Sequence, residues 1–582
     1  MSRSWRRIEG PLPEMLSKPA SFSDPASGYQ YHLIADGERV YQEESSEQPG
    51  GADRLVREAK YLVGSGTRSL SLVSEDRGYL CQMPLGWFAD VQAWKLSPGY
   101  ELYNWRFSRP IVPGCIACHG SPVVHRAPTR NRYDLPVTEG ISCERCHGAG
   151  QEHVKQWQAG RENQGEEQPD ATIVNPARLT ADRANDICLQ CHLQGDVSVY
   201  PEGAHAFSFQ AGDRLTDHRV DFLISTDNPE ELGIASHGGR MMRSRCYVES
   251  GRSLTCILCH DPHRPVRDFT SEHFDSKCAT CHTAQSCNRP VASGESNGST
   301  GCTQCHMPKR TTFESQHLAM TDHWIRRSAS APPVTQAADA KPEEATELVS
   351  AWPGEPDEGR LGAAYVLWHE SMGPKPAAVD RAIELLSSAL RDDPARRETR
   401  FWLASALISR YRSRDAVPIL RDLLAESPDW RLARFRLGIA YDQLRQYSDA
   451  IAQYRQVIDQ APDWMEPYVL LARLHLFRRE FSAATQLLNQ QLFYQEDATA
   501  YANLALARRL GGGPLPESLE LIDKALRLEP RLVAGYLNRA VLLSEAGLRE
   551  QAVADYERVL AMEPGNQTAR AGLQALQAAG DP

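Results

Sequence analysis

The chain has 582 residues, of which 41% are hydrophobic and 24% are charged, and its formal net charge is −11. This length corresponds to about three or four domains, and the negative charge, without any long basic tract, excludes nucleic acid as an expected partner. No apolar run approaches the roughly 18 residues that a membrane-spanning helix needs, so we expect no transmembrane segment in this chain.

Residues 1–110 are predicted to be rich in β-strand. The segment "YQYHLIADGERVYQ" places two strand-like runs around Asp36 and Gly37, a residue pair that favours a hairpin turn. We interpret this region as a structural β unit at the start of the chain.

Residues 111–327 are rich in Cys, His, Gly and Pro and show little sustained periodicity. Such a segment cannot build an ordinary core from its own side chains. We therefore predict an irregular domain with short helices, whose interior is filled by something other than side chains, as metals or disulfides fill small domains. Residues 328–350 are small, polar and proline-containing, which is typical of a linker.

Residues 351–582 change to helical periodicity with short breaks. Five prolines lie on one lattice with a period of 34 residues, at Pro394, Pro428, Pro462, Pro530 and Pro564. A small residue lies twelve positions before each lattice point, as Ala450 does before Pro462. This pattern resembles the tetratricopeptide repeat, in which small residues let two helices approach closely and proline ends the second helix. We predict an all-α solenoid of about six repeats with a capping helix.

The motif Cys-x-x-Cys-His occurs six times within residues 111–327. Two thiols at this spacing add to the two vinyl groups of one haem, and the adjacent imidazole binds the iron. The alternatives are zinc sites or a disulfide framework, but neither needs a histidine directly after each second cysteine. We therefore predict six covalently bound haem c groups. The predicted thioether cysteines are Cys115, Cys118, Cys143, Cys146, Cys188, Cys191, Cys256, Cys259, Cys278, Cys281, Cys302 and Cys305. The predicted proximal iron ligands are His119, His147, His192, His260, His282 and His306.

Three of the 15 cysteines lie outside these motifs, namely Cys81, Cys246 and Cys287. We predict a disulfide between Cys246 and Cys287, because thiols pair outside the cytoplasm. Free buried cysteines are the alternative.

The histidines outside the motifs are numerous enough to give every haem iron a second axial ligand. His263 follows His260 by three residues, which span at most about 10 Å. That reach is too short for His263 to pass around the edge of a macrocycle to the opposite face of the same iron. The same reasoning applies to His153 and His125, which follow the second and first motifs. As ligands these three histidines would serve neighbouring haems; the alternative is a surface or hydrogen-bonding histidine.

Several segments around the motifs resemble a family of exported multihaem cytochromes c fused to tetratricopeptide repeats. They are "GISCERCHGAGQEHV", "VNPARL", "ICLQCHLQG", "RSRCYVESGRSLTCILCHDPH" and "CTQCHMPKR…HLAMTDHWI". The haem region of that family is related to the tetrahaem cytochrome c of nitrifying bacteria, and the resemblance covers roughly residues 25–327 and continues into the repeats. It implies distal iron ligands at His153, His237, His263 and His323, with His317 at another recurrent position.

The resemblance also implies an extracytoplasmic location, because haem is attached covalently outside the cytoplasm. The chain begins "MSRSWRRIEG", without the apolar segment of a signal peptide. Members of the family begin with a signal peptide and an additional Cys-x-x-Cys-His, so we expect a truncated start, and a seventh haem if the native chain extends upstream.

These features predict an electron-transfer protein whose haems form a relay and whose repeats dock a redox partner protein. An alternative is a multihaem reductase or oxidase of small nitrogen or sulfur compounds with one open haem site. The absence of a Cys-x-x-Cys-Lys motif weighs against that alternative, and no residue is singled out as catalytic. A redox sensor or scaffold would use the same features as the electron carrier.

Overall fold

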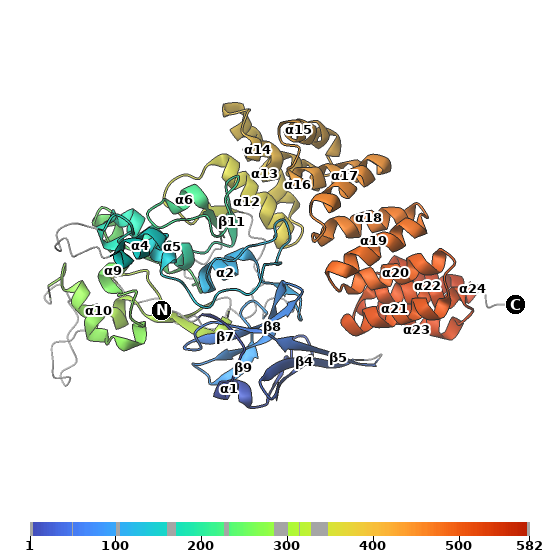
Figure 1. Cartoon of the computed structure of the whole chain (residues 1–582), viewed down its shortest axis with the longest axis horizontal. Helices are drawn as coiled ribbons and strands as arrows, with labels where there is room; N and C mark the ends of the chain where they lie inside the picture. Colours follow the sequence, from blue (N-terminus) through green and yellow to red (C-terminus); the bar gives the residue numbers. More distant parts are fainter. Residues whose placement is uncertain are drawn as a thin grey trace.

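A computed structural model of the chain describes residues 4–48, 51–100, 105–159, 170–225, 232–283, 301–312, 315–327 and 347–578. Figure 1 shows β-sheets formed by the N-terminal residues, a region of short helices, and a long array of paired helices that runs to the C-terminus. Within these ranges, no helix combines the length and the apolar character needed to cross a membrane.

The N-terminal region contains two antiparallel sheets. The first has the order β2-β3-β4-β5, and the second has the order β1-β6-β7-β8-β10 with β9 beside β8. The strands are β1 (Trp5–Arg7), β2 (Ala20–Ser23), β3 (Gln30–Asp36), β4 (Arg39–Gln48), β5 (Gly51–Ala59), β6 (Tyr61–Val63), β7 (Ser69–Asp76), β8 (Tyr79–Phe88), β9 (Ala93–Leu96) and β10 (Arg109–Pro110), with the short helix α1 (Glu14–Ser17). Asp36 pairs with Arg39 across the β3–β4 turn, so the predicted hairpin is confirmed.

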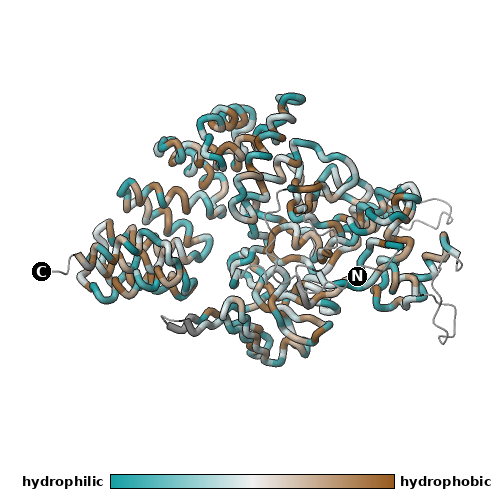
Figure 2. The backbone as a smooth tube through the Cα atoms, turned by 180° about the vertical axis from the view of Figure 1, so that it is seen from behind, coloured by the Kyte–Doolittle hydropathy of each residue, from teal (hydrophilic) through white to brown (hydrophobic). Residues whose placement is uncertain are grey.

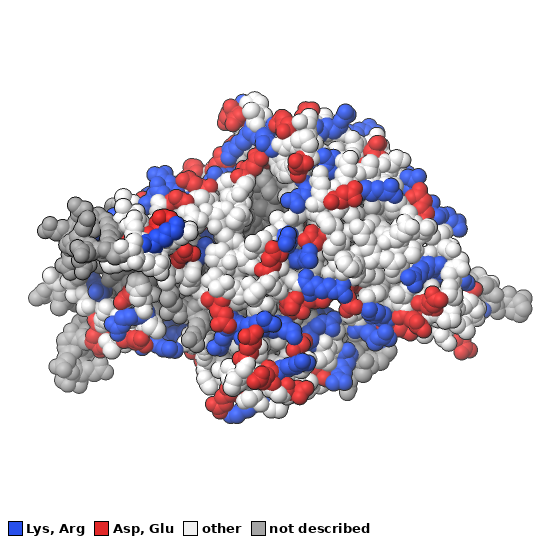
Figure 3. Space-filling view, in the orientation of Figure 1, with Lys and Arg blue, Asp and Glu red and all other residues white. Residues whose placement is uncertain are grey.

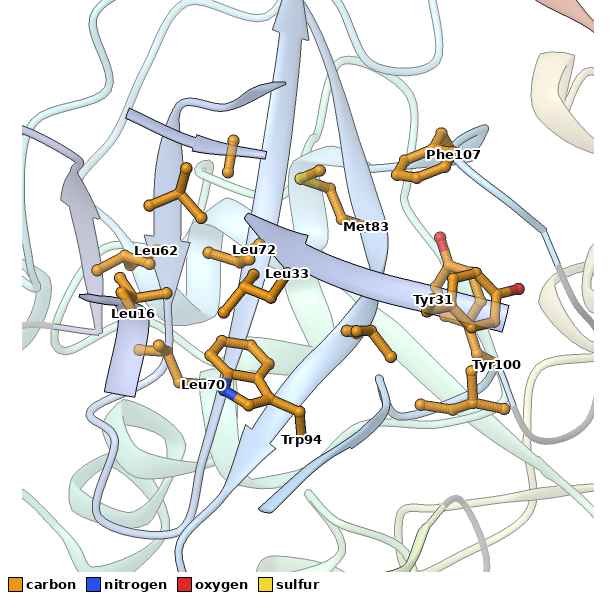
Figure 4. Packing of buried hydrophobic residues seen from close by; sticks show 14 of the residues in the cluster. Leu16, Tyr31, Leu33, Leu62, Leu70, Leu72, Met83, Trp94, Tyr100 and Phe107 are labelled. Carbon is orange, nitrogen blue, oxygen red and sulfur yellow. The ribbon is translucent and has the colours of Figure 1, made fainter. Parts of the chain in front are cut away.

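The two sheets share one apolar core. Tyr31 and Leu33 of β3 are buried, as are Leu70 and Leu72 of β7, because alternate residues of a strand face the same side. In Figure 4, Leu33, Leu70 and Leu72 lie together in this core, and Tyr31 lies toward Tyr100. The buried amide of Gln42 links the sheets by exchanging two 2.9 Å hydrogen bonds with the backbone of β8.

The middle region is irregular, and its helices have 4 to 12 residues. They are α2 (Pro113–His119), α3 (Glu144–His147), α4 (Gln151–Gln158), α5 (Ala181–His192), α6 (Leu215–His218), α7 (His237–Met242), α8 (Arg245–Glu249), α9 (Cys256–Cys259), α10 (Ser271–Cys278) and α11 (Cys302–His306). Short strands complete it: β11 (Val197–Val199), β12 (Val220–Ile224), β13 (Lys309–Thr312), β14 (Ser315–Thr321) and β15 (Leu348–Ser350). The short helices agree with the prediction from composition.

The strand β15 corrects the predicted end of the linker. Its residues, 348–350, were assigned to the linker by composition, but they pair with β12 in a three-stranded sheet. Their backbone groups find partners in that sheet, so these residues are part of the packed structure. The rest of the predicted linker up to residue 346 lies outside the described residues.

The C-terminal region consists of helix pairs, as the 34-residue period predicts. Its helices are α12 (Glu358–Ser371), α13 (Pro376–Asp392), α14 (Arg397–Ser409), α15 (Ser413–Glu426), α16 (Arg431–Gln443), α17 (Tyr447–Gln460), α18 (Met465–Phe477), α19 (Phe481–Tyr494), α20 (Ala498–Leu510), α21 (Leu515–Leu528), α22 (Val533–Glu545), α23 (Arg549–Met562) and α24 (Gln567–Ala578). The small residues of the lattice are all fully buried, namely Ala382, Ala416, Ala450, Ala484, Ser518 and Ala552. Apolar and hydrophilic residues alternate along the helices of this array (Figure 2).

Close packing within one repeat gives a testable consequence at Gly438. A Cβ added at this position would lie 2.6 Å from the ring of Tyr454, so Gly438→Ala forces the ring or the helix to move. We expect a loss of about 1–3 kcal/mol in the free energy of unfolding, measured by urea denaturation followed by circular dichroism. Gly565→Ala is the matched control, because a Cβ there has no neighbour within 4 Å, and an equal loss in both variants would contradict this packing.

The repeats also contact the N-terminal half of the chain through their inter-repeat loops. Arg132 Nη1 lies 2.5 Å from a carboxylate oxygen of Asp463, and the hydroxyl of Tyr79 donates to the carbonyl oxygen of Asp463 at 2.6 Å. Arg77 donates to the carbonyls of Leu492 and Phe493 at the end of α19. The solenoid is thus held by tertiary contacts as well as by chain connectivity.

Basic and acidic side chains are interspersed over the face shown in Figure 3.

Candidate functional site

Each Cys-x-x-Cys-His motif lies in, or directly after, one of the short helices. The first three motifs end α2, α3 and α5, the fourth and sixth occupy α9 and α11, and the fifth begins at the last residue of α10. In the first, third, fourth and sixth motifs both cysteines lie within the helix, and residues three apart in a helix share one face, so these pairs of thiols project to the same side. That arrangement presents two thiols and one imidazole to a single flat group.

Helix α5 connects the first four motifs, because it packs against α2, α3 and α9. Asn185 fixes α9 by donating to the carbonyl of Leu254 and accepting from the backbone N–H of Cys256, both at 3.0 Å. Gln190 donates to the carbonyl of Arg145 at 3.0 Å, and Arg145 donates to the carbonyl of Ala117 at 3.1 Å. Motifs that are far apart in the sequence are therefore neighbours in the fold.

Three motif histidines each lie beside a histidine from another segment. The pairs are His147 with His263, His192 with His237, and His260 with His323, with ring centroids 5.9, 5.4 and 6.1 Å apart. Two imidazoles that bind one metal ion from opposite sides, with metal–nitrogen distances of about 2 Å, have their centroids about 6 Å apart. The spacing of all three pairs suits shared coordination.

The hydrogen bonds of several imidazoles leave the metal-binding nitrogen free. His147 Nδ1 bonds the carbonyl of Val174 at 2.8 Å, His306 Nδ1 that of Arg326 at 2.5 Å, and His323 Nδ1 that of Thr321 at 2.9 Å. A carbonyl only accepts, so Nδ1 carries the proton and Nε2 keeps a lone pair. A backbone carbonyl behind a ligating histidine is the usual support of such a ligand.

Burial keeps the imidazoles of His237 and His323 neutral. Burial, together with the neighbouring His323 ring, lowers the pKa of His237 to about 3. Burial likewise lowers the pKa of His323 to about 4. Neutral imidazoles are the form that binds a metal, so both rings are ready ligands at neutral pH.

Buried polar atoms in this region also fit a bound group. Ser142 Oγ, Arg145 Nε, Gln190 Oε1 and His237 Nδ1 are buried and have no hydrogen-bond partner among the described residues. Buried polar atoms in proteins nearly always have a partner. Together with the paired thiols and imidazoles, these atoms fit a cofactor that carries a metal and polar substituents. No three Cys, His, Asp or Glu side chains of the described ranges gather around one bare ion.

Sequence reasoning missed a buried ion pair that holds two of these histidines. Arg240 donates to both carboxylate oxygens of Asp322 at 2.9 and 2.6 Å, and the two side chains are 3% and 0% exposed. Arg240 belongs to α7, which begins at His237, and Asp322 precedes His323, whose ring centroid lies 4.7 Å from that of His237. No sequence pattern distinguishes Asp322 from other acidic residues of this region.

The same ion pair predicts a pH dependence of stability. Burial alone would raise the pKa of Asp322, but hydrogen bonds from Arg240 and the backbone hold it below its ordinary value. A carboxyl group whose folded pKa is lowered stabilises the fold above its unfolded pKa of about 3.9, and this stabilisation is lost as the pH falls through the folded pKa. We expect the difference in unfolding free energy between the native chain and Asp322→Asn to shrink below about pH 4, measured by urea denaturation between pH 3 and pH 7. A pH-independent difference would contradict this role.

The other predicted site residues have different surroundings. His153 Nδ1 bonds Asp170 at 2.8 Å, and His125 Nε2 bonds the carbonyl of Thr129 at 2.7 Å. The side chain of His317 lies outside the described residues. Of the predicted disulfide, Cys287 also lies outside them, and Cys246 is a half-buried thiol. The structure thus brings three of the six candidate distal histidines, His237, His263 and His323, beside motif histidines.

Comparison with known families supports the repeats. Models of the tetratricopeptide repeat match residues 408–463 and 533–566. The all-helical C-terminal region is therefore a tetratricopeptide-repeat solenoid.

A curated relative resembles part of the chain. The multiheme cytochrome MtrA of Shewanella baltica (strain OS185) is 26% identical over 152 residues, which cover 25% of this chain and 42% of that protein. The match thus spans less than half of the relative's length.

Solved repeat proteins also resemble the chain. The tetratricopeptide-repeat protein YrrB, which has an unusual peptide-binding site, is 16% identical, and the match covers 33% of this chain and 99% of YrrB with a TM-score of 0.28. A tetratricopeptide-repeat protein of Parabacteroides merdae is 17% identical, with 39% of this chain and 86% of that protein covered and a TM-score of 0.31.

Proposed function

We propose that this chain is an extracytoplasmic multihaem c-type cytochrome that transfers electrons through closely spaced haems, most of them bound by two histidines. The repeat solenoid docks a redox partner protein, a role that extended repeat surfaces commonly serve. The partial likeness to a multiheme cytochrome and the six attachment motifs support this proposal.

The observation that carries the proposal is the set of three histidine pairs. In each pair the motif histidine is the proximal ligand and its neighbour is the distal ligand. His263 then serves the haem attached at 143–147, His237 the haem at 188–192, and His323 the haem at 256–260. When bound, haem c supplies one-electron chemistry at its iron. The two imidazoles of each pair would hold the iron and would exclude water and small ligands from it.

Three attachment motifs remain without a distal ligand in this assignment. They are the motifs at 115–119, 278–282 and 302–306, and we propose that their distal ligands come from His125, His153 and His317. His125 would have to give up its bond to Thr129, since Nε2 is the nitrogen engaged there.

The same three motifs favour the alternative, a multihaem redox enzyme with one open haem site. Among the described residues, the rings of His119, His282 and His306 form no ring contact with another histidine. An iron with a single protein ligand could bind a small nitrogen or sulfur compound. The catalytic haem would then be one of these three.

Haem counting and spin state test the proposal. The chain is exported with an added signal peptide in a cell that matures c-type cytochromes, and haem per chain, the EPR spectrum and carbon monoxide binding are measured. We expect six haems, all low-spin, and no carbon monoxide binding. Cys143→Ser with Cys146→Ser should lower the count to five, whereas Cys81→Ser should leave it at six. One high-spin iron per chain that binds carbon monoxide would favour the enzyme, and a chain without haem would overturn both functions.

A further inference from the structure

Arg145 occupies the place where three attachment motifs meet. It belongs to the second motif, its Nη2 donates to Ala117 of the first motif, and its carbonyl accepts from Gln190 of the third. The residue is 7% exposed, so its charged group lies in the protein interior. A charge at this junction acts on all three motifs at once.

The described part of the chain places no carboxylate beside the charge of Arg145. Among the residues that the structure describes, no carboxylate forms an ion pair with it, and its Nε has no hydrogen-bond partner. The neighbouring Arg219 also contacts Gln190, through a hydrogen bond to its carbonyl oxygen. Unlike Arg145, it forms an ion pair, with the carboxylate of Asp221 at 2.8 Å. Burying a guanidinium without a carboxylate lowers the free energy of unfolding by several kcal/mol. The presence of such a charge at this junction therefore indicates a functional role.

We infer that Arg145 raises the reduction potential of the haems attached at the motifs that meet around it, 115–119, 143–147 and 188–192. Reduction adds one electron from an external one-electron donor to a ferric iron and lowers the net charge of that cofactor by one. A fixed positive charge nearby therefore stabilises the reduced state, and the interior screens this interaction weakly. The inference rests on the proposed function. It implies that the haems at this junction are reduced before haems of lower potential.

Spectroelectrochemical titration of the haem-loaded chain, with dithionite as the reductant, tests this inference. Arg145→Gln removes the charge and should move at least one haem to a lower reduction potential. Arg145→Lys keeps the charge and should restore most of that potential. Gln190→Glu leaves the arginine in place but supplies a carboxylate at the same junction, so it should lower the potential as well. Arg245→Gln is the matched control, because Arg245 is 84% exposed and already paired with Glu249.

The outcomes separate this inference from the proposed function. A native chain without haem refutes the proposed function before any variant is made. Six haems in every variant with unchanged potentials overturn the role of Arg145 but leave the cytochrome intact. If Arg145→Gln and Gln190→Glu both lose haem, the charge is a requirement of folding, and the inference is likewise overturned.

Discussion

Replacing His263 with alanine is expected to turn the haem proposed at 143–147 high-spin, while the haem proposed at 256–260 stays low-spin. The reason is the position of the side chain. The His263 ring lies 5.9 Å from that of His147, with an angle of 10° between the ring planes, whereas His260 lies beside His323. EPR should show one high-spin iron per chain, and the variant should gain carbon monoxide binding.

Deleting one haem at a time identifies the affected iron. In a chain that lacks the second haem, through Cys143→Ser and Cys146→Ser, the His263→Ala change should add no high-spin signal. In a chain that lacks the fourth haem, through Cys256→Ser and Cys259→Ser, it should still add one. The opposite pattern would contradict the assignment. His369→Ala, in the repeat region, is the control for removal of a histidine remote from the motifs.

Replacing Asp322 with asparagine is expected to lower the free energy of unfolding by about 3–5 kcal/mol, because it removes the buried carboxylate that pairs with Arg240 and also lies 3.4 Å from Arg310 and 3.5 Å from Arg326. The variant should also disturb the low-spin signals of the two haems assigned to His237 and His323. Arg240 belongs to α7, the helix that begins at His237. Asp322 directly precedes His323 and accepts a hydrogen bond from the backbone N–H of Trp324 at 2.9 Å. One substitution would thus act on two irons.

Urea denaturation of the haem-loaded chain measures the stability change, and EPR measures the spin states. Glu249→Gln is the control, because its pair with Arg245 is solvent-exposed and should contribute no more than about 0.5 kcal/mol. If Asp322→Asn and Glu249→Gln have equal small effects, the pair of Arg240 and Asp322 does not hold this region together.

The sequence was most informative where local patterns determine structure. The lattice of prolines and small residues predicted the helix pairs, because each repeat has the same close contact, seen at Ala450 and Ala484. The hairpin at Asp36 and Gly37 followed from turn chemistry alone. Residues 348–350 were misassigned, because composition resembling a linker does not exclude a short strand that completes a distant sheet.

The sequence was least informative about partners that are distant along the chain. The separation of only three residues indicated that His263 could not reach the far side of a haem held by His260. It could not indicate that His147 would be the neighbour of His263. That proximity depends on how α5 brings α3 and α9 together. The pair of Arg240 and Asp322 is likewise a product of tertiary folding, since the two residues are 82 positions apart.

The most direct test of the central claim, that the six motifs hold covalently bound haem, is to count alkylated cysteines in the exported chain after denaturation and reduction. Reduction opens disulfides but leaves thioether links intact, so mass spectrometry with peptide mapping should find label only at Cys81, Cys246 and Cys287. Iodoacetamide label on the motif cysteines of a chain without haem would contradict the account.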